Sequence, residues 1–215
     1  MKFGVVVFPG SNCDHDMVYL LRNKLNQEVV ELWHKETDLK NCDMIILPGG
    51  FSYGDYLRSG AIASLSPVME SVKKFADKGG YVLGVCNGFQ ILCESGLLDG
   101  ALLANDNRKF VCKNQYIATQ TNSTVFTRKA VKGKALNVPI AHGEGRFFAD
   151  ADTIKRLNDN EQILFRYCNA EGKIAPEFNP NGSIENIAGI TNKTKNVFGT
   201  VSYTHLRAHE TGRNL

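Results

Sequence analysis

A cysteine between an apolar run and a helical pattern is the residue of this sequence best suited to covalent chemistry. Residues 81–85 have the unbroken apolar character of a buried strand, which stops at Cys86 and gives way to apolar residues at helical spacing. Gly84 and Gly88 flank the cysteine, and such small neighbours let a strand and a helix meet at a sharp turn. The N–H groups and dipole of the helix N-terminus favour a thiolate. We therefore predict a nucleophile elbow with Cys86 as the catalytic nucleophile.

Acyl transfer by a thiol also needs N–H donors at the position where the oxyanion forms. The backbone of Asn87, directly after the thiol, and that of Gly50, in a Pro-Gly-Gly turn after another predicted strand, are candidate donors. Gln90 follows Cys86 by four residues, lies on the same helix face and could reach a polar substrate. An isolated cysteine after an apolar run is more often a buried core residue. The matching glycine turns are what favour the catalytic interpretation.

The histidines provide weaker evidence than the cysteine. His142 lies in a polar, glycine-rich loop after a predicted strand, and taken alone such a loop indicates only a solvated turn. No histidine stands at a metal-ligand spacing from a cysteine or carboxylate, so we predict no metal site. The sequence also lacks a G-x-G-x-x-G motif and a Gly-Lys-Ser/Thr phosphate loop, which makes a nucleotide-binding Rossmann protein a weak alternative.

A parallel sheet is the element that would bring these residues together. Strand–helix alternation in the first hundred residues predicts right-handed crossovers and an α/β fold, a doubly wound, mostly parallel sheet with helices on both faces. Shorter strands after residue 98 predict the second half of that sheet, with a small antiparallel insertion. Because ligands bind beyond the carboxyl ends of parallel strands, the turns at 9–12, 48–51 and 86–88 should line one crevice. The predicted strands are 2–8, 28–33, 43–47, 81–85, 110–119, 136–141, 162–167 and 187–191, and the predicted helices are 14–25, 68–78, one beginning at the elbow, and 152–158.

Length and composition indicate one ordinary globular domain over residues 1–215. The net charge of +3, without a basic cluster, argues against a nucleic-acid partner. The apolar run at 3–8 is too short for a signal peptide or a membrane span. Six scattered cysteines without a C-x-x-C pair fit a disulfide framework poorly, so we expect a reducing cytoplasm.

Four motifs in a fixed order resemble one family. They are F-P-G-S-N-C-D at 8–14, L-P-G-G-F-S-Y-G-D-Y-L-R at 47–58, G-V-C-N-G-F-Q at 84–90 and A-H-G-E-G-R-F at 141–147. Together they closely resemble the glutaminase subunits of phosphoribosylformylglycinamidine synthase, which are class I (triad-type) glutamine amidotransferases of purine biosynthesis. The resemblance extends from residue 2 to about residue 199 and implies the flavodoxin-like fold of that class.

The resemblance also implies a reaction and partners. Cys86 would attack the side-chain amide of glutamine, release ammonia and form a thioester that water hydrolyses, with Gly50 and Asn87 in the oxyanion hole. Gln90 would help to hold the glutamine, and the loop around His142 would lie near the substrate and the partner. A large synthetase subunit, joined by a small accessory subunit, would use ATP with magnesium to convert formylglycinamide ribonucleotide to formylglycinamidine ribonucleotide. No cofactor is expected on this chain itself.

The last residues depart from the family pattern. The family carries its catalytic histidine and glutamate in a Pro-His-Pro-Glu motif, and no His-Pro-Glu exists in this sequence. Ungapped continuation places Tyr203 and His205 at those positions, and the adjacent pair His209 and Glu210 is a poor mimic because neighbouring side chains point in different directions. We assign the triad roles to none of them and expect residues from about Thr200 to be foreign, from a truncated gene or an assembly artefact. A catalytically impaired glutamine-binding subunit is therefore the alternative to an active glutaminase, and another cysteine-elbow hydrolase is a third.

Overall fold

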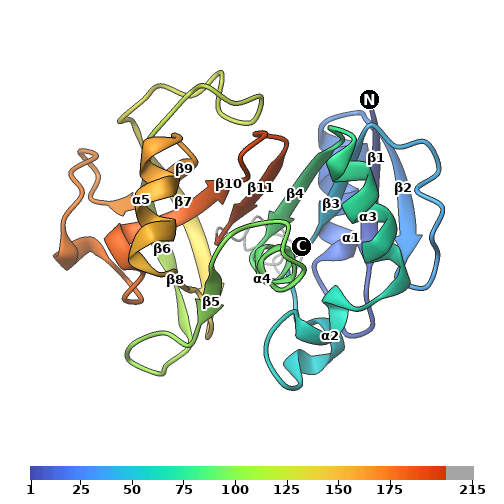
Figure 1. Cartoon of the computed structure of the whole chain (residues 1–215), viewed down its shortest axis with the longest axis horizontal. Helices are drawn as coiled ribbons and strands as arrows, with labels where there is room; N and C mark the ends of the chain where they lie inside the picture. Colours follow the sequence, from blue (N-terminus) through green and yellow to red (C-terminus); the bar gives the residue numbers. More distant parts are fainter. Residues whose placement is uncertain (202–215) are drawn as a thin grey trace, which may run out of the picture.

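Unbroken apolar runs form the central strands of the computed structural model, which describes residues 1–201. Nine of the strands make one sheet (Figure 1). In sheet order they are β2 (Glu28–Trp33), β1 (Lys2–Val7), β3 (Met44–Leu47), β4 (Tyr81–Val85), β11 (Val197–Thr200), β10 (Ile187–Thr191), β9 (Ile163–Cys168), β6 (Val111–Thr119) and β7 (Ala135–His142).

The sheet has a parallel half and an antiparallel half that meet at β11. This strand pairs parallel with β4 on one side and antiparallel with β10 on the other. From β2 to β11 all neighbours are parallel, whereas β10, β9, β6 and β7 alternate in direction. A separate two-stranded sheet consists of β5 (Ala101–Leu103) and β8 (Arg146–Phe148). The predicted α/β fold class is confirmed, and its antiparallel strands continue the main sheet.

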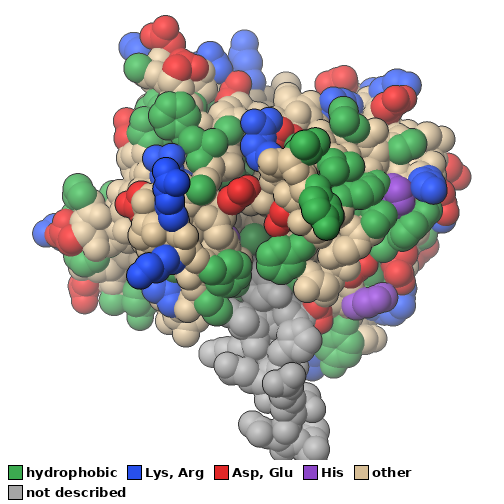
Figure 2. Space-filling view, turned by 90° about the horizontal axis from the view of Figure 1, so that it is seen from below, with side chains coloured by type: hydrophobic (Ala, Val, Ile, Leu, Met, Phe, Trp, Pro, Cys, Tyr) green, Lys and Arg blue, Asp and Glu red, His purple; other side chains and the backbone are tan. Residues whose placement is uncertain are grey.

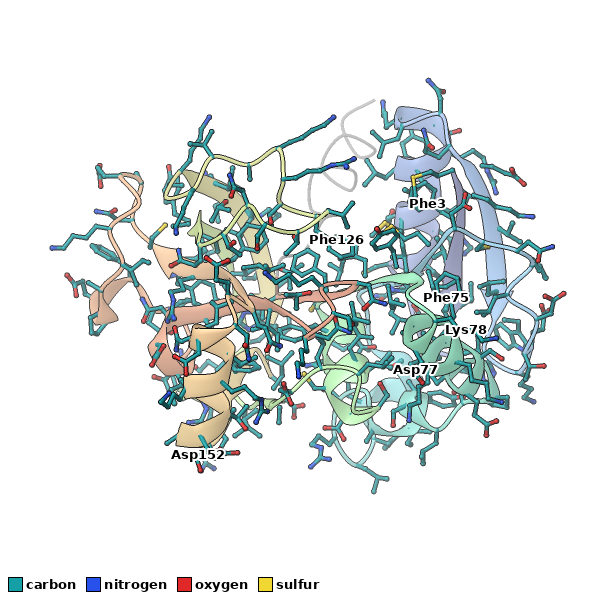
Figure 3. The ribbon with its side chains drawn as sticks, turned by 45° about the horizontal axis from the view of Figure 1, so that its top comes forward. Phe3, Phe75, Asp77, Lys78, Phe126 and Asp152 are labelled. Carbon is teal, nitrogen blue, oxygen red and sulfur yellow. The ribbon has the colours of Figure 1, made fainter. Side chains whose placement is uncertain are left out.

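Helices cover both faces of the parallel half. Helix α1 (Asp14–Tyr19), continued by the π-helix η1 (Leu20–Lys24), packs on one face with Val5 and Ile46, and α3 (Pro67–Asp77) belongs to the core of the other face with Val6 and Ile45. Adjacent residues of one strand therefore enter different cores, as the pleat of a strand requires. Both residues of each pair must be apolar, which explains the unbroken apolar runs in the sequence. Figure 3 labels Phe3 and Phe75, which belong to these two cores.

Two further helices complete the fold, one at the junction of the two halves and one over the antiparallel half (Figure 1). Helix α4 (Asn87–Glu94) follows β4 directly and contacts β3, β4 and β11. Helix α5 (Ala151–Asp159) buries Ile154 and Leu157, and its N-cap Asp150 accepts a hydrogen bond from the Thr153 backbone at 2.8 Å. The short helices are η2 (Ser52–Asp55), α2 (Ala61–Ser64), η3 (Pro176–Phe178) and η4 (Ile184–Asn186).

Most of the predicted elements are present, with bounds within two residues of those expected. Helix α2 and strands β5, β8 and β11 are not among the predicted elements, because three or four residues are too few to show a periodic pattern. No helix among residues 1–201 has the length and apolar character needed to cross a bilayer. On the face shown in Figure 2, acidic and basic side chains are interspersed, in keeping with the small net charge.

Candidate active site

Cys86 occupies the sharp corner between β4 and α4. Its backbone dihedrals are φ 52° and ψ −107°, a conformation that a residue with a side chain adopts only when its surroundings impose it. The Cys86 N–H donates to the carbonyl of Thr200 at 2.8 Å, and the Cys86 carbonyl accepts from the N–H of Phe89 at 2.9 Å. Both sides of the corner are thus fixed by β11 and by the first turn of α4. The predicted sharp corner between a strand and a helix is present, with Cys86 at its apex, and the role of Cys86 as a nucleophile stays a prediction.

The flanking glycines are required by close backbone contacts. A Cβ atom on Gly84 would lie 2.6 Å from the carbonyl oxygen of Gly88. A Cβ atom on Gly88 would overlap the carbonyl group of Leu47, the last residue of β3. These contacts draw α4 tightly against the ends of two parallel strands, which is the reason the sequence pattern suggested.

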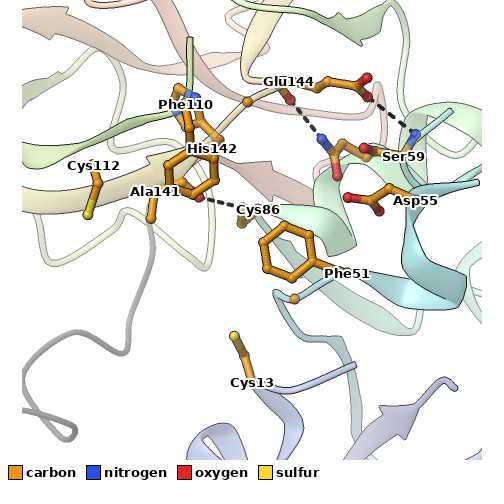
Figure 4. A pocket seen from close by; sticks show the side chains of 13 residues that line it. Cys13, Phe51, Asp55, Ser59, Cys86, Phe110, Cys112, Ala141, His142 and Glu144 are labelled. Atoms are coloured by element: carbon orange, nitrogen blue, oxygen red, sulfur yellow. Dashed lines mark hydrogen bonds between the residues drawn. The ribbon is translucent and has the colours of Figure 1, made fainter. Parts of the chain in front are cut away.

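A cavity of about 350 Å³ opens at this corner (Figure 4), a volume at the lower end of the range for small-molecule sites. Two of the three predicted glycine turns contribute to it through Gly50 and Cys86. The third turn packs behind them, where the carbonyl of Pro9 accepts a hydrogen bond from the Tyr53 N–H at 2.6 Å. The cavity is lined by Cys13, Gly50, Phe51, Asp55, Ser59, Cys86, Gln90, Phe110, Cys112, Ala141, His142, Gly143 and Glu144.

Four of the five predicted site residues line this cavity, namely Gly50, Cys86, Gln90 and His142. The fifth, Asn87, presents its backbone N–H to the Cys86 thiol. Its side chain is buried, where Oδ1 accepts from the Ser52 N–H at 3.2 Å. The structure therefore brings the predicted residues together, and their individual roles in the oxyanion hole and in glutamine binding stay predictions.

The protonation state of Cys86 differs from the expectation. The Asn87 N–H lowers the pKa of the thiol, as a helix N-terminus should. Burial raises the pKa by more than the N–H lowers it, and the charges of Cys13 and Asp55 raise it further. The pKa of Cys86 is therefore raised to about 12. Within residues 1–201 Cys86 is thus a neutral thiol, whose Sγ donates to the Ala141 carbonyl at 3.7 Å.

Gln90 connects the elbow helix to the loop after β7. Its Oε1 accepts from Asn87 Nδ2 at 2.9 Å, and its Nε2 donates to the backbone carbonyl of Glu144 at 2.7 Å. Both ends of the amide are therefore engaged within the protein. Gln90 fixes the distance between α4 and the loop of residues 143–145, in addition to any contact with a substrate.

His142 is buried, with 4 % of its surface exposed, and its neighbours define which ring nitrogen carries the proton. Asn105 Nδ2 donates to the carbonyls of Lys109 and His142 at 2.8 and 2.9 Å, which directs Asn105 Oδ1 toward His142 Nδ1 at 3.2 Å. Nδ1 must then be the donor. Nε2 is left as an acceptor and has no hydrogen-bond partner among the described residues. Burial lowers the pKa of His142 to about 4, so the ring is neutral near pH 7.

Several cavity residues were not predicted from the sequence as site residues. Asp55 and Glu144 stand inside the quoted motifs, but no spacing rule distinguished them from solvated loop residues. Asp55 Oδ1 accepts from Asn87 Nδ2 at 3.3 Å, and Glu144 Oε2 accepts from the Ser59 N–H at 3.3 Å. Cys13 and Cys112 place two more thiols in the cavity wall. The sequence candidates Tyr203, His205, His209 and Glu210 lie outside the described residues.

Comparison with known proteins gives consistent matches along the chain. The CobB/CobQ-like glutamine amidotransferase domain matches residues 1–212. A protein of Koribacter versatilis named phosphoribosylformylglycinamidine synthase subunit PurQ is 56 % identical over 203 residues, which cover 94 % of this chain and 88 % of that protein. The protein of the same name from Chlorobaculum parvum is 55 % identical over 210 residues, or 98 % of this chain and 83 % of that protein.

Solved structures agree with the sequence matches. A chain of the structure of PurLQS from Thermotoga maritima superposes with a TM-score of 0.81 at 40 % identity, covering 94 % of this chain and 86 % of that chain. A glutamine amidotransferase from Thermotoga maritima superposes with a TM-score of 0.60 at 14 % identity, over 94 % of this chain and 75 % of that chain. The second match shows the shared fold alone.

Proposed function

The chain belongs to the glutamine amidotransferase family of the PurQ subunits of phosphoribosylformylglycinamidine synthase, and we propose that it hydrolyses glutamine at Cys86 and supplies ammonia to a synthetase subunit. The observation that carries this proposal is the elbow itself. A cysteine held at φ 52°, with the Asn87 N–H directed at its sulfur, opens into a cavity of small-molecule size. An amide carbon placed at the sulfur would have an N–H donor beside its developing oxyanion.

The proposed reaction has two steps. The Cys86 sulfur attacks the side-chain amide carbon of glutamine, the C–N bond breaks, and the nitrogen leaves as ammonia after gaining a proton. Water then attacks the resulting thioester and releases glutamate and the thiol. The N–H groups of Gly50 and Asn87 would stabilise the oxyanion in both steps. Gln90 and His142 would contact the bound glutamine.

The thiol of Cys86 requires a base, because its pKa of about 12 keeps it protonated near pH 7. His142 is unsuited to this role since burial lowers its pKa to about 4. The first step therefore requires either a base from outside residues 1–201 or a rearrangement on assembly with the partner. For this reason a glutamine-binding subunit with impaired catalysis is the second candidate function, motivated by the absence of a His-Pro-Glu motif from the sequence.

The proposed partners are a large synthetase subunit together with a small accessory subunit. They follow from the match to a chain of the PurLQS structure. ATP and magnesium would bind the synthetase, which would convert formylglycinamide ribonucleotide to formylglycinamidine ribonucleotide with the ammonia made here. The cytoplasm is the proposed compartment, because six scattered cysteines without a C-x-x-C pair fit a disulfide framework poorly.

A labelling experiment tests both candidate functions. The full chain, alone and with a synthetase of the kind that pairs with PurQ, is incubated with glutamine or with a diazoketone analogue of glutamine, and glutamate and protein mass are measured. Cys86→Ser should abolish the adduct, and Cys112→Ser, which removes another thiol of the same cavity, should not. Glutamate formation with an adduct on Cys86 supports the glutaminase. An adduct without glutamate supports the impaired subunit, and the absence of both contradicts the proposal.

A further inference from the structure

The cavity at Cys86 has an acidic end. Its lining includes two carboxylates, Asp55 and Glu144, and no lysine or arginine. Within residues 1–201 neither carboxylate forms an ion pair. Arg58 is the nearby cation, and the charge of Glu144 helps to raise the pKa of Arg58. The Arg58 guanidinium nevertheless pairs with Glu94, outside the cavity. Carboxylates that face a cavity without a cation favour a ligand that brings one.

Ser59 holds the two carboxylates beside one another. Its hydroxyl hydrogen-bonds to Asp55, and its backbone N–H donates to Glu144 Oε2 at 3.3 Å. Asp55 accepts one more hydrogen bond, from Asn87 Nδ2 at 3.3 Å. A carboxylate has about four acceptor positions, so both groups keep capacity for a further donor. Burial and the charge of Glu144 raise the pKa of Asp55, in keeping with two carboxylates that share a confined space.

A third acceptor lines the same cavity independently of the carboxylates. His142 Nε2 is buried, lacks a hydrogen-bond partner among the described residues, and is unprotonated because Asn105 Oδ1 engages the other ring nitrogen. A buried acceptor without a donor is unfavourable unless a ligand supplies one. Figure 4 shows the side chain of Glu144 extending toward Ser59 and Asp55, with His142 on the opposite side of the cavity.

We propose that Asp55, with Glu144 beside it, binds the α-ammonium group of glutamine while the side-chain amide lies at Cys86. This inference rests on the proposed function, because it assumes glutamine in the cavity. An ammonium group offers three N–H donors and a positive charge, which the acceptors at this end of the cavity lack. The carboxylates would then act as a specificity determinant that distinguishes glutamine from amides without an α-ammonium group.

The test compares two labels that differ only in that group. The first is the diazoketone analogue of glutamine, and the second is the same diazoketone with hydrogen in place of the α-ammonium. The rate of Cys86 modification is measured by mass spectrometry for the full chain, and each rate is divided by the rate with iodoacetamide, which corrects for changes in thiol reactivity. The wild-type chain should prefer the ammonium-bearing label by about 10- to 100-fold, the range for a charged hydrogen bond.

Asp55→Asn should reduce this preference to nearly one, and Glu144→Gln should reduce it in part. Asp55→Glu, which keeps the charge, should recover part of the preference. Asp77→Asn is the matched control, because Asp77 is an exposed residue of α3 (Figure 3) and does not line the cavity. All variants are compared by circular dichroism and thermal unfolding.

The outcomes separate this inference from the function on which it rests. If iodoacetamide modifies wild-type Cys86 and neither diazoketone does, the glutaminase proposal fails. If wild type prefers the ammonium-bearing label and Asp55→Asn keeps that preference, the function stands and the role of Asp55 is wrong. An equal slowing of both labels in Asp55→Asn would make Asp55 a positioning residue for Asn87 and would also overturn the proposal.

Discussion

The two walls of the cavity are held in place by different means. The elbow wall, formed by Gly50, Asp55, Cys86 and Gln90, comes from the parallel half of the sheet, and its shape depends on backbone packing around glycines. The loop wall, formed by residues 141–144, comes from the antiparallel half and depends on the buried side chain of Asn105. A wall held by close backbone contacts is disrupted when an atom is added to a glycine. A wall held by hydrogen bonds is disrupted when one polar side chain is removed. The two walls should therefore respond to different substitutions.

The largest effect is expected for Gly88→Ala on the elbow wall. The added Cβ would overlap the carbonyl group of Leu47, and neither backbone can retreat without separating α4 from β3. We expect a loss of about 3 kcal/mol or more in unfolding free energy, together with loss of the Cys86 conformation. Urea unfolding and labelling of Cys86 by the diazoketone measure the two effects.

Gly96→Ala provides the matched control at the other end of α4. Gly96 has a positive φ of 75°, unlike Gly88, but a Cβ there would meet no atom within 4 Å. Only the strain of the left-handed conformation remains, about 1 kcal/mol, and labelling of Cys86 should be unaffected. Equal destabilisation by the two substitutions would show that steric contact does not hold the elbow wall.

The next effect is expected for Asn105→Ala on the loop wall. The substitution leaves the carbonyls of Lys109 and His142 without their donor, and the Gly145 N–H and the His142 ring without their acceptor. The carbonyl of the exposed Lys109 can hydrogen-bond to water instead, so three buried groups lose their partner, and at about 1 kcal/mol each we expect a loss of about 3 kcal/mol. Asn107→Ala, which removes a single bond to the Lys109 N–H at an exposed position, should cost less than about 1 kcal/mol.

Asn105→Ala should also affect two properties of the cavity differently, namely the reactivity of Cys86 and the preference for the ammonium-bearing label. Because the elbow does not depend on Asn105, iodoacetamide should still modify Cys86 in Asn105→Ala, while preference for the ammonium-bearing label should fall. Both readouts are taken below the unfolding temperature of the variant. A variant that loses labelling of Cys86 by every reagent would indicate that the two walls form one cooperative unit.

The difference between the walls also explains what the sequence could predict. The parallel strands and the elbow were predictable, because an unbroken apolar run marks a buried strand and the glycines at 84 and 88 mark a sharp corner, whichever segment packs against them. The loop wall was predictable only as a strand followed by a loop. Asn105 lies 37 residues from His142, and nothing in the local sequence marks it as the partner of that histidine.

The charge state of the site was the least predictable feature. The helix N-terminus favoured a thiolate at Cys86, but burial, which depends on the whole fold, raises its pKa to about 12. Asp55 was likewise indistinguishable from a solvated loop residue until the fold placed it beside Asn87 and Ser59. Backbone geometry can thus be inferred from local patterns, whereas electrostatics requires the assembled cavity.

The smallest effect is the pH dependence that His142 should give to the stability of the loop wall. Burial lowers the pKa of His142 from 6.5 to about 4 in the folded protein. Between these values the unfolded chain binds a proton at this residue and the folded protein does not, so stability from this source falls as the pH falls through this window. Above pH 6.5 His142 does not lower the free energy of unfolding, and by pH 5 it should lower this free energy by about 2 kcal/mol.

Urea unfolding of the wild-type chain and of His142→Gln between pH 8 and pH 5 isolates this contribution, because the other titrating groups are common to both proteins. The wild-type chain should lose more stability over this range than His142→Gln, by about 2 kcal/mol. Gly96→Ala, altered just beyond the end of α4, should instead follow the wild-type pH profile with a constant offset. Parallel profiles for wild type and His142→Gln, or an NMR titration of His142 near pH 6.5, would mean that this ring is hydrated and that the loop wall is not closed around it.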